Sequence, residues 1–475
     1  MESCYLNELL PYISISGKNA LVKGVSIDSR TIVKDDIYFA IKGKRYDGHD
    51  FIKDAVSRGA CAIIYSKDMH FDKQNFGSLN KVAMIKTKDT VVALGEIARV
   101  YIEKFKNTKK VGITGSNGKT TTKEMLSSIL KTKVKTLSNK GNFNNRIGLP
   151  LSVFNLDSYV NYGVFEMGTS FFGEIKILSN IIKPDVGVIT NIGFSHIEEF
   201  KSLEGVLREK IDLFYNVKEN GVLVVNNDDE NLKHISDKNF KNKTVIRYSL
   251  KTASSDVYAS NIKMSQNGTS FSLCYNDEST DIFIPAKGVF NVSNALAAAS
   301  CAISLNVPFA NIKMGLESFI SPKMRMETIT TSNGIILIND SYNANPSSTK
   351  ASIETILELY PDKKINLVLG DMLELGENSD KFHFELGKFI DNKNVNSISL
   401  LGNKSLNVAN AINSKNVFYA KDKESLLLHL KKLTENDSVF LFKASRGMKL
   451  EEVYEKFLDI LQLRGKIINA IPHIL

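Results

Sequence analysis

Cysteine is scarce in this chain of 475 residues, which contains only four. Cys4, Cys61, Cys274 and Cys301 stand far apart in the sequence, and no two of them form a CxxC pair. Cysteines so few and so scattered exclude a disulfide scaffold and a cysteine-ligated zinc site. The composition is typical of a reducing compartment, and we expect a cytoplasmic location.

Long apolar runs are also missing, since none approaches the roughly 20 residues that a helix needs to cross a bilayer. The first residues, MESCYLNELLPYISISGK, carry an acid near the start and no basic region, unlike a secretory signal. The sequence has no solenoid period and no low-complexity segment. We therefore expect no stable insertion into a membrane.

Concentrated charge of one sign is a third feature that the chain lacks. Its 61 Lys and Arg stand against 52 Asp and Glu, a formal net charge of +9 that is spread along the whole sequence. The densest basic stretches, Lys104 to Lys110 and Lys131 to Lys135, are short. Because nucleic-acid-binding proteins gather positive charge into a patch or stripe, we expect no nucleic-acid partner. The balance fits equally well a preference for anionic small molecules such as nucleotides.

The order of apolar and polar segments predicts an α/β fold. From residue 109, continuous apolar runs alternate with helical stretches, among them Thr121 to Leu130 and Leu203 to Val217. This alternation is typical of a parallel sheet covered on both faces. Polar, alternating segments between residues 255 and 286 indicate antiparallel strands, and a helix around Asn294 to Leu305 follows them.

Three domains are predicted from this pattern and from the length. Short apolar runs fill the first hundred residues, and one amphipathic helix from Val91 to Thr108 leads into a Lys-rich connector. A second set of apolar runs and helices begins after Ser321 and Pro322. We place the domains at 1–108, 109–320 and 321–475, with a parallel-sheet central domain and a Rossmann-like C-terminal domain.

The strongest chemical signal is the segment VGITGSNGKTTT, from Val111 to Thr122. A strand runs into a glycine-rich loop whose backbone N–H groups can surround phosphate oxygens, and a helix N-terminus follows. The spacing departs from the usual phosphate loop, because Ile113 stands at its first glycine position. We expect the central domain to be an ATPase domain, with ATP held by Gly115, Ser116, Asn117, Gly118, Lys119, Thr120 and Thr121.

Two polar residues follow neighbouring strands of the predicted central sheet. Glu166 ends the run YGVFEMG, and His196 comes just after DVGVIT. Ligands gather at the carboxyl ends of strands in open α/β sheets, so both should face the phosphate loop. Glu166 and the hydroxyl of Thr120 are suitable oxygen ligands for Mg²⁺, whereas imidazole is a less usual one. A strand-end salt bridge and a loop histidine are the ordinary alternatives.

Adjacent asparagines in GNFNNRIGLP form another candidate binding segment. Asn144 and Asn145 offer uncharged donors and acceptors, which suit the backbone or sugar of a substrate. A polar turn before Gly148 and Pro150 would explain the same composition.

The phosphate-loop form GxxGxxGKTTT resembles that of the Mur ligase family, which is related to the folylpolyglutamate synthases. These enzymes join a carboxylate to an amine through an acyl phosphate. The string KIDLF stands where the family has K-x-E-x-F, with Asp212 in place of the glutamate. The resemblance implies that Lys210 is carbamylated by CO₂ and helps to hold Mg²⁺, although a lysine on a helix normally faces solvent.

Strings after residue 321 resemble one branch of this family, which joins D-alanyl-D-alanine to UDP-N-acetylmuramoyl-tripeptide. They are NDSYNANPSST, from Asn339 to Thr349, and VLGDMLELGENSDKFH, from Val368 to His383. The resemblance implies a nucleotide contact by Asp340. It implies substrate contacts by Tyr342, Asn343 and Asn345, and a strand-to-helix turn is the ordinary reading of that string.

Four shorter matches complete the resemblance. GVFNVSNALAAA, KMRME, FKASR and the N-terminal DSR string stand in the family's order, with Phe290, Met324 and Ala444 at positions where the family usually has other residues. An arginine suits recognition of a diphosphate. The implied nucleotide contacts are Asn291, Asn294 and Arg325, and the implied substrate contacts are Ser29, Arg30, Lys443, Ser445 and Arg446.

The resemblance implies an ATP- and Mg²⁺-dependent ligase of the last cytoplasmic step in peptidoglycan precursor synthesis. We expect a monomer, although the sequence does not establish the oligomeric state. Lys119, Arg325, Lys210 and His196 are the expected catalytic residues, and Thr120, Glu166, His196 and Lys210 the expected metal site. Two alternatives stay open: the sibling ligase that adds the third amino acid, and a phosphate-loop regulator or nucleic-acid-associated ATPase. The sequence leaves open which residue is third in the tripeptide.

Overall fold

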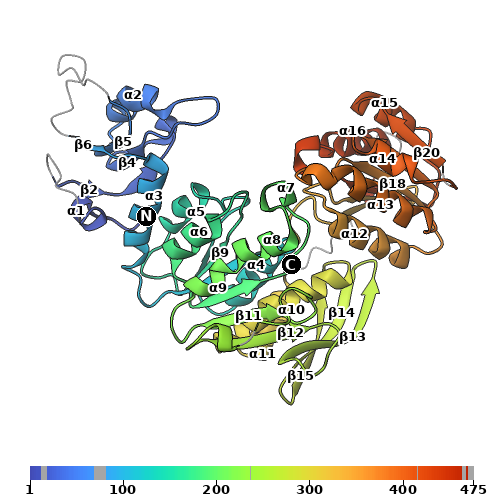
Figure 1. The fold of residues 1–475 in the computed structure, drawn as a ribbon, viewed down its shortest axis with the longest axis horizontal. Coiled ribbons are helices and arrows are strands. Elements are labelled where there is room, and N and C mark those ends of the chain that lie inside the picture. Colours follow the sequence, from blue (N-terminus) through green and yellow to red (C-terminus); the bar gives the residue numbers. More distant parts are fainter. Residues whose placement is uncertain (12–18, 69–81, 236, 415, 463–466, 469–475) are drawn as a thin grey trace.

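The computed structural model describes residues 1–11, 19–68, 82–235, 237–414, 416–462 and 467–468. The chain forms three α/β units, and the N-terminal and C-terminal units lie on opposite sides of the central one (Figure 1). The predicted three-domain α/β fold is therefore confirmed. Within the described residues, no helix combines the length and the apolar character that crossing a membrane requires.

The N-terminal unit is built on a four-stranded parallel sheet in the order β3-β4-β5-β6. A two-stranded antiparallel ribbon, β1-β2, lies beside it. The elements are β1 (Cys4–Tyr5), α1 (Leu6–Leu9), β2 (Leu21–Val22), β3 (Gly24–Ser26), η1 (Ser29–Thr31), β4 (Asp36–Phe39), η2 (Gly48–Phe51), α2 (Ile52–Ser57), β5 (Ala62–Tyr65), β6 (Ala83–Lys86) and α3 (Thr90–Ile102).

Helix α3 links this unit to the central one and is shorter than predicted. It begins where the Asp89 carboxylate accepts hydrogen bonds from the first free backbone N–H groups, and it ends at Ile102 rather than at Thr108. The chain turns after Ile102, and Phe105 packs against Tyr101, with ring centroids 5.1 Å apart. The Thr108 hydroxyl then donates to the carbonyl of Val160, at 2.7 Å, and fixes the connector to the central unit.

The central unit contains one nine-stranded sheet in the order β15-β14-β13-β12-β11-β10-β7-β9-β8. All pairs from β8 to β13 are parallel, as predicted, and β13, β14 and β15 are antiparallel. The antiparallel strands extend the same sheet. The strands are β7 (Lys109–Thr114), β8 (Thr136–Ser138), β9 (Tyr162–Glu166), β10 (Val186–Ile189), β11 (Val222–Asn226), β12 (Thr244–Ser249), β13 (Val257–Ser265), β14 (Gly268–Tyr275) and β15 (Glu278–Ile284).

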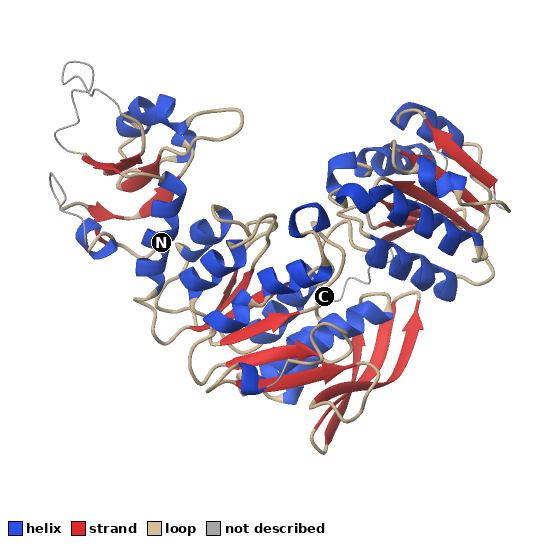
Figure 2. Ribbon diagram, viewed as in Figure 1, coloured by secondary structure: helices blue, strands red, loops and turns tan. Residues whose placement is uncertain are grey.

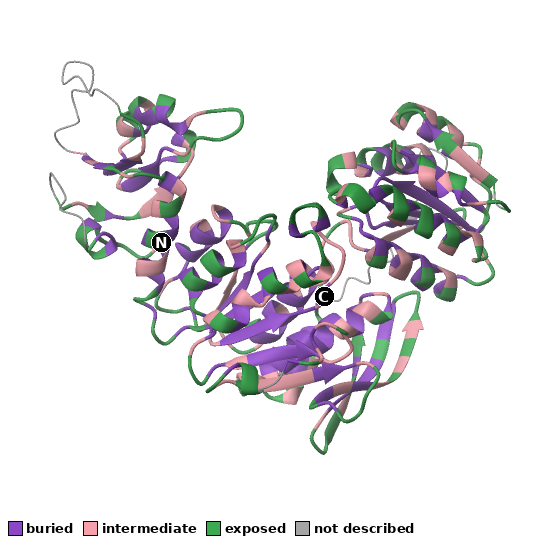
Figure 3. Cartoon of the chain, in the orientation of Figure 1, coloured by how far each residue is buried: buried purple, intermediate pink, exposed green. Residues whose placement is uncertain are grey.

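Helices cover both faces of this sheet (Figure 2). The parallel strands β7, β9, β10 and β11 are largely buried, whereas β13 and β15 are partly exposed (Figure 3). The predicted helical stretch from Leu203 to Val217 is present up to Asn216, and it is divided at Ile211, whose backbone is still right-handed helical, into two helices. The helices are α4 (Lys119–Lys131), α5 (Gly148–Val153), α6 (Glu174–Ile182), α7 (Ile197–Phe200), α8 (Leu203–Lys210), α9 (Asp212–Asn216), η4 (Asp237–Asn239), α10 (Val289–Ser304) and α11 (Phe309–Glu317).

The C-terminal unit has a seven-stranded sheet in the order β20-β19-β18-β21-β17-β16-β22. Its five strands from β20 to β17 are parallel. Near one edge, β16 runs antiparallel to both of its neighbours, β17 and β22. The elements are β16 (Glu327–Thr331), β17 (Ile336–Asn339), α12 (Pro346–Leu359), β18 (Lys364–Gly370), η5 (Gly376–Asn378), α13 (Ser379–Asp391), β19 (Ser397–Leu401), α14 (Leu406–Asn410), β20 (Asn416–Ala420), α15 (Lys423–Leu430), β21 (Ser438–Lys443), η6 (Arg446–Met448), α16 (Glu451–Gln462) and β22 (Ile467–Ile468).

Candidate active site

A cavity of about 890 Å³ lies between the central and the C-terminal unit. The central unit contributes the loops after β7, β9 and β10, and the C-terminal unit contributes the segments 321–326 and 340–352. These central loops all follow the carboxyl ends of parallel strands, where ligands bind in open α/β sheets. The cavity is therefore placed as the sequence predicted.

The loop after β7 has the conformation that a phosphate loop needs. Gly115 and Gly118 have φ of +147° and +81°, values that residues with a Cβ rarely adopt. A Cβ on Gly115 would lie 1.9 Å from the Thr190 hydroxyl oxygen. The loop is fixed to the strand β10 side, because the Asn117 backbone N–H donates to the Asn191 side-chain oxygen at 2.9 Å. The rigid loop aims the N-terminus of α4 into the cavity.

Lys119 opens α4 and lies at the cavity wall. Its ammonium donates to the carbonyls of Gly115, at 2.7 Å, and of Ser116, at 3.2 Å. Desolvation lowers the pKa of Lys119, the nearby Arg325 lowers it further, and the carboxylate of Glu166 opposes both effects. Cations from both units thus approach the same wall of the cavity.

Glu166 ends β9, lines the cavity and is only 2% exposed. Its Oε1 accepts a hydrogen bond of 2.8 Å from the Asn144 side chain. Its Oε2 has no hydrogen-bond partner among the residues placed by the structure, and the ammonium of Lys123 is 3.9 Å away. A buried carboxylate oxygen without a partner is costly, so this oxygen is suited to a cation.

Lys210 lies at the end of α8 and is 1% exposed. The alternative that places it on a solvated helix face is therefore wrong. Burial sets the pKa of Lys210 well below its usual value, and the charge of Lys119 lowers it further. The neighbouring Glu209 offsets this in part, but its carboxylate also accepts from Gly173 N–H at 2.6 Å and Ile175 N–H at 2.8 Å. Lys210 is consequently a buried amine with a weakened hold on its proton.

His196 lines the cavity but is oriented by the C-terminal unit. Its Nδ1 lies 2.7 Å from Oε2 of Glu374, and this contact lowers the pKa of that carboxyl. The backbone N–H of Glu198 also donates to the carbonyl of Glu374, at 3.2 Å. The expected metal ligand His196 thus uses one ring nitrogen to join the two units, which leaves Nε2 as its other possible donor atom.

The turn before α12 contacts the phosphate loop directly. Asn345 is the N-cap of α12, and its side-chain oxygen accepts from the backbone N–H of Ser348 at 2.9 Å. Its amide nitrogen donates to the side-chain oxygen of Asn117, at 2.7 Å. Ser347 accepts from the Asn117 amide, at 3.2 Å.

Asn343 is exposed and lines the cavity, and its side chain accepts from the N–H of Ala344.

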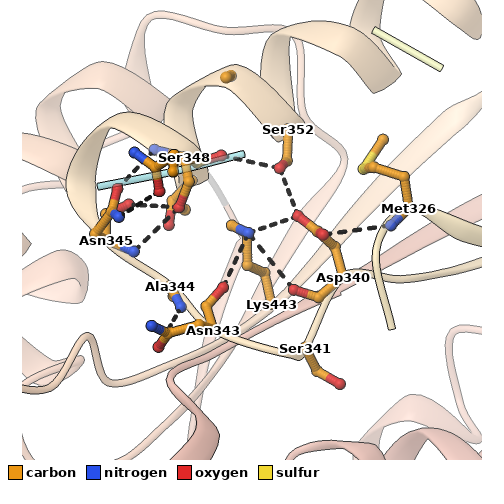
Figure 4. Close-up of polar contacts among 12 residues, drawn as sticks. Met326, Asp340, Ser341, Asn343, Ala344, Asn345, Ser348, Ser352 and Lys443 are labelled. Carbon is orange, nitrogen blue, oxygen red and sulfur yellow. Dashed lines mark hydrogen bonds and ion pairs between the residues drawn. The ribbon is translucent and has the colours of Figure 1, made fainter. Parts of the chain in front are cut away.

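Asp340 forms a buried cluster beneath this turn (Figure 4). Its Oδ2 accepts from the ammonium of Lys443, at 2.5 Å, and from the hydroxyl of Ser352, at 2.6 Å. Its Oδ1 accepts from the backbone N–H of Met326, at 3.3 Å. The carboxylate expected to contact the nucleotide is therefore also bonded to three groups of its own unit.

Asn291 and Asn294, on α10, line the cavity beside the phosphate loop. The Asn294 amide donates to the Asn291 side-chain oxygen, at 3.1 Å, and the Asn291 amide donates to the carbonyl of Lys287, at 2.8 Å. The Lys287 ammonium donates to the hydroxyl of Thr328 in β16, at 2.6 Å. Desolvation lowers the pKa of Lys287 to about 8.

Four expected substrate contacts lie outside the cavity lining. Ser29 and Arg30 belong to the N-terminal unit, where Arg30 pairs with Asp28 at 2.7 Å. Ser445 is buried and accepts from the backbone N–H of Leu373, at 2.8 Å. Arg446 pairs with Glu451 at 2.9 Å. The other expected residues, except Gly115, line the cavity.

Two residues of the site were missed by the sequence analysis. Lys123 follows Lys119 by one helical turn and is buried, and its ammonium donates to the carbonyl of Asn139 at 2.8 Å. Its i+4 spacing from Lys119 is a signal that could have found it. Glu374 stands in the quoted string VLGDMLELGENSDKFH, but nothing in that string shows that it meets His196. No three His, Cys, Asp or Glu side chains come together as a metal site in the part of the chain that the structure describes.

Three family models match the chain. They are described as the Mur ligase family catalytic domain, over residues 21–102, the Mur ligase middle domain, over residues 113–302, and the Mur ligase glutamate ligase domain, over residues 324–446. Each matched range falls within one of the three units.

Curated proteins are similar over nearly the whole chain. The UDP-N-acetylmuramoyl-tripeptide–D-alanyl-D-alanine ligase of Bacillus subtilis is 35% identical over 452 residues, which cover 93% of this chain and 94% of that protein. The protein of the same name from Haemophilus influenzae is 34% identical and covers 97% of this chain and 98% of its own length.

Solved structures share the arrangement. MurF from Acinetobacter baumannii has a TM-score of 0.89 at 29% identity, covering 97% of this chain and 99% of that one. MurF ligase from Thermotoga maritima in complex with ADP has a TM-score of 0.83 at 28% identity, covering 94% and 99%.

Proposed function

The chain belongs to the Mur ligase family, and we propose that it joins D-alanyl-D-alanine to UDP-N-acetylmuramoyl-tripeptide with the use of ATP. The observation that carries this proposal is the contact between the phosphate loop and the DSYNANP turn through Asn117 and Asn345. A ligase must hold ATP and two further substrates together, and this contact closes the ATP site with a segment from another unit. The product is the UDP-N-acetylmuramoyl-pentapeptide of peptidoglycan precursor synthesis.

The reaction has two steps, and the chain supplies charge for the first. The tripeptide carboxylate attacks the γ-phosphorus of ATP, the bond from that phosphorus to the β,γ-bridging oxygen breaks, and an acyl phosphate and ADP result. Lys119 and Arg325 offset the negative charge of this transfer, which depends mainly on positioning and electrostatics. The amine of the dipeptide then attacks the acyl carbon, forms the amide and releases phosphate. Closure of the cavity by the C-terminal unit would keep water from the acyl phosphate.

The residues at the cavity fit a Mg²⁺ ion. Glu166 presents its buried Oε2, which has no hydrogen-bond partner among the described residues. The hydroxyl of Thr120, at the start of α4, accepts one hydrogen bond from Arg325 and has a second lone pair for a metal ion. Lys210 is buried and readily deprotonated, which is the form of an amine that adds to CO₂ to give a carbamate and release a proton. His196 would contribute through Nε2. When bound, the ion would supply charge that offsets the phosphate oxygens.

We assign one substrate to each of the three units. Residues 1–108 would bind the UDP moiety, with Ser29 and Arg30. Residues 109–320 would bind ATP, with Asn144 and Asn145 toward the tripeptide. Residues 321–475, of which part lies outside the described residues, would hold the dipeptide. There the exposed Asn343 is better placed than Ser445 or Arg446, whose side chains are already engaged.

Phosphate release with and without each co-substrate tests the proposal. We expect release to require both the UDP-tripeptide and D-alanyl-D-alanine, and a free diamino acid with the UDP-dipeptide should not replace them. Turnover with the diamino acid would favour the sibling ligase, and turnover stimulated by DNA or RNA alone would contradict a ligase. We further propose a monomer located in the cytoplasm, and light scattering would detect a dimer.

A further inference from the structure

Arg325 crosses from the C-terminal unit to the phosphate loop of the central unit. Its guanidinium donates to the hydroxyl of Thr120, at 3.1 Å, and lies near enough to Lys119 to lower the pKa of that lysine. The residues on both sides of it, Met324 and Met326, have φ of +58° and +53°. Left-handed backbone is unfavourable for residues with a side chain and persists only when the surroundings hold it.

Hydrogen bonds to the loop after β17 hold Met324 and Met326, on both sides of Arg325. The backbone N–H of Tyr342 donates to the carbonyl of Met324, at 3.3 Å, and the N–H of Met326 donates to Asp340, at 3.3 Å. Lys443 and Ser352 fix the Asp340 carboxylate in turn (Figure 4). The loop after β17 therefore fixes the backbone from which the Arg325 side chain extends.

The Tyr342 side chain contacts the guanidinium itself. The guanidinium carbon of Arg325 lies 4.3 Å from the centroid of the Tyr342 ring. An aromatic face at this distance attracts a cation and restricts it to the plane above the ring. The backbone hydrogen bonds fix the Cα position of Arg325, and the ring of Tyr342 fixes the position of its guanidinium.

We propose that Tyr342 is a positioning residue that holds the guanidinium of Arg325 over the phosphate loop during phosphoryl transfer. The inference rests on the proposed function, because it assigns Arg325 to the charge of that transfer. It differs from the expectation that Tyr342 binds substrate, since a contact with the dipeptide or the nucleotide would act mainly through KM. If Tyr342 positions Arg325, loss of its ring should lower kcat, and it should do so only in a protein that still contains Arg325.

A double-mutant cycle separates these roles. Tyr342→Leu keeps an apolar side chain but removes the ring, and Tyr342→Phe keeps the ring. Loss of a cation–π contact predicts a decrease of about 3- to 30-fold in kcat for Tyr342→Leu. We expect Tyr342→Phe to recover most of this loss, and both KM values to change less than kcat.

The cycle is completed with Arg325→Ala alone and with Arg325→Ala combined with Tyr342→Leu. We expect Tyr342→Leu to cost less than about twofold once Arg325 is absent. Additive losses, or a rise in KM for one substrate at unchanged kcat, would overturn the positioning role. Equal thermal midpoints for Tyr342→Leu and Tyr342→Phe would show that any difference in kcat is not a folding defect, whereas loss of kcat in proportion to a lowered midpoint would contradict the proposal.

The failure of the proposed function has a different signature. A wild-type protein whose phosphate release ignores D-alanyl-D-alanine would contradict the ligase assignment. Wild-type release that needs both co-substrates, together with an additive cycle, would contradict only the role of Tyr342.

Discussion

Replacement of Asn345 should affect both the stability of the C-terminal unit and the KM for ATP. The two effects can be separated because the side-chain oxygen and nitrogen of Asn345 make different contacts. The oxygen caps α12 at Ser348, and the nitrogen reaches Asn117 in the phosphate loop. Asn345→Ala removes both interactions. Asn345→Ser keeps a good N-cap but has a side chain too short to reach the phosphate loop.

The expected sizes follow from these two interactions. Loss of an N-cap costs about 1 kcal/mol, which lowers the thermal midpoint of a unit of this size by roughly 2–4 °C. Loss of the 2.7 Å bond between the Asn345 nitrogen and the Asn117 oxygen removes about 0.5–1.5 kcal/mol, which corresponds to a rise of about 2- to 12-fold in the KM for ATP.

Thermal melts and initial rates at varied ATP and varied dipeptide measure both effects. We expect Asn345→Ala to show the lower midpoint and the higher KM for ATP, and Asn345→Ser to show only the higher KM. An unchanged KM for ATP in both variants would show that the bond between Asn345 and Asn117 does not support ATP binding. A rise confined to the KM for D-alanyl-D-alanine would instead return Asn345 to the direct substrate contact that the sequence suggested.

Three further predictions concern lysines. Lys119→Ala should lower phosphate release at least about 100-fold, since electrostatic stabilisers of this kind commonly contribute 10²–10³-fold, and retention of a tenth of the activity would contradict the role. Lys210→Ala should be nearly inactive yet partly restored by millimolar short-chain carboxylates, whereas near-normal activity of Lys210→Arg would exclude the carbamate. Lys287, whose folded pKa of about 8 lies below its unfolded value, is destabilising when charged. That penalty is complete below about pH 8 and is lost as the pH rises toward about 10.5. Lys287→Met should therefore raise the free energy of unfolding at pH 7, by about 1 kcal/mol after loss of the bond to Thr328, and should raise it less at pH 10. A gain that does not shrink with pH would show that burial of its charge is not the cause.

The features of the site that depend on local sequence were predictable. The glycines, the lysine and the threonines of the phosphate loop stand within a few residues, and Glu166 follows an apolar run that could only be a buried strand. Their relative placement follows from the rule that the carboxyl ends of parallel strands share one edge. The alternation of strands and helices along the chain was also predictable from local sequence patterns.

The contacts between units were not predictable in this way. His196 and Glu374 are far apart in the sequence, as are Asn117 and Asn345, and each pair meets only because two separate units pack together. The end of α3 was misplaced for a similar reason. Thr108 could continue a helix, but its hydroxyl bonds to the carbonyl of Val160 in the central unit instead, and such tertiary contacts override local preference.

In the proposed function, one chain couples ATP cleavage to amide formation. Its most direct test measures phosphate and UDP-N-acetylmuramoyl-pentapeptide in the same reaction, with ATP, Mg²⁺, UDP-N-acetylmuramoyl-tripeptide and D-alanyl-D-alanine present. We expect one phosphate for each pentapeptide formed and little phosphate when the dipeptide is omitted. Phosphate release at an unchanged rate without the dipeptide, or without formation of the pentapeptide, would contradict it.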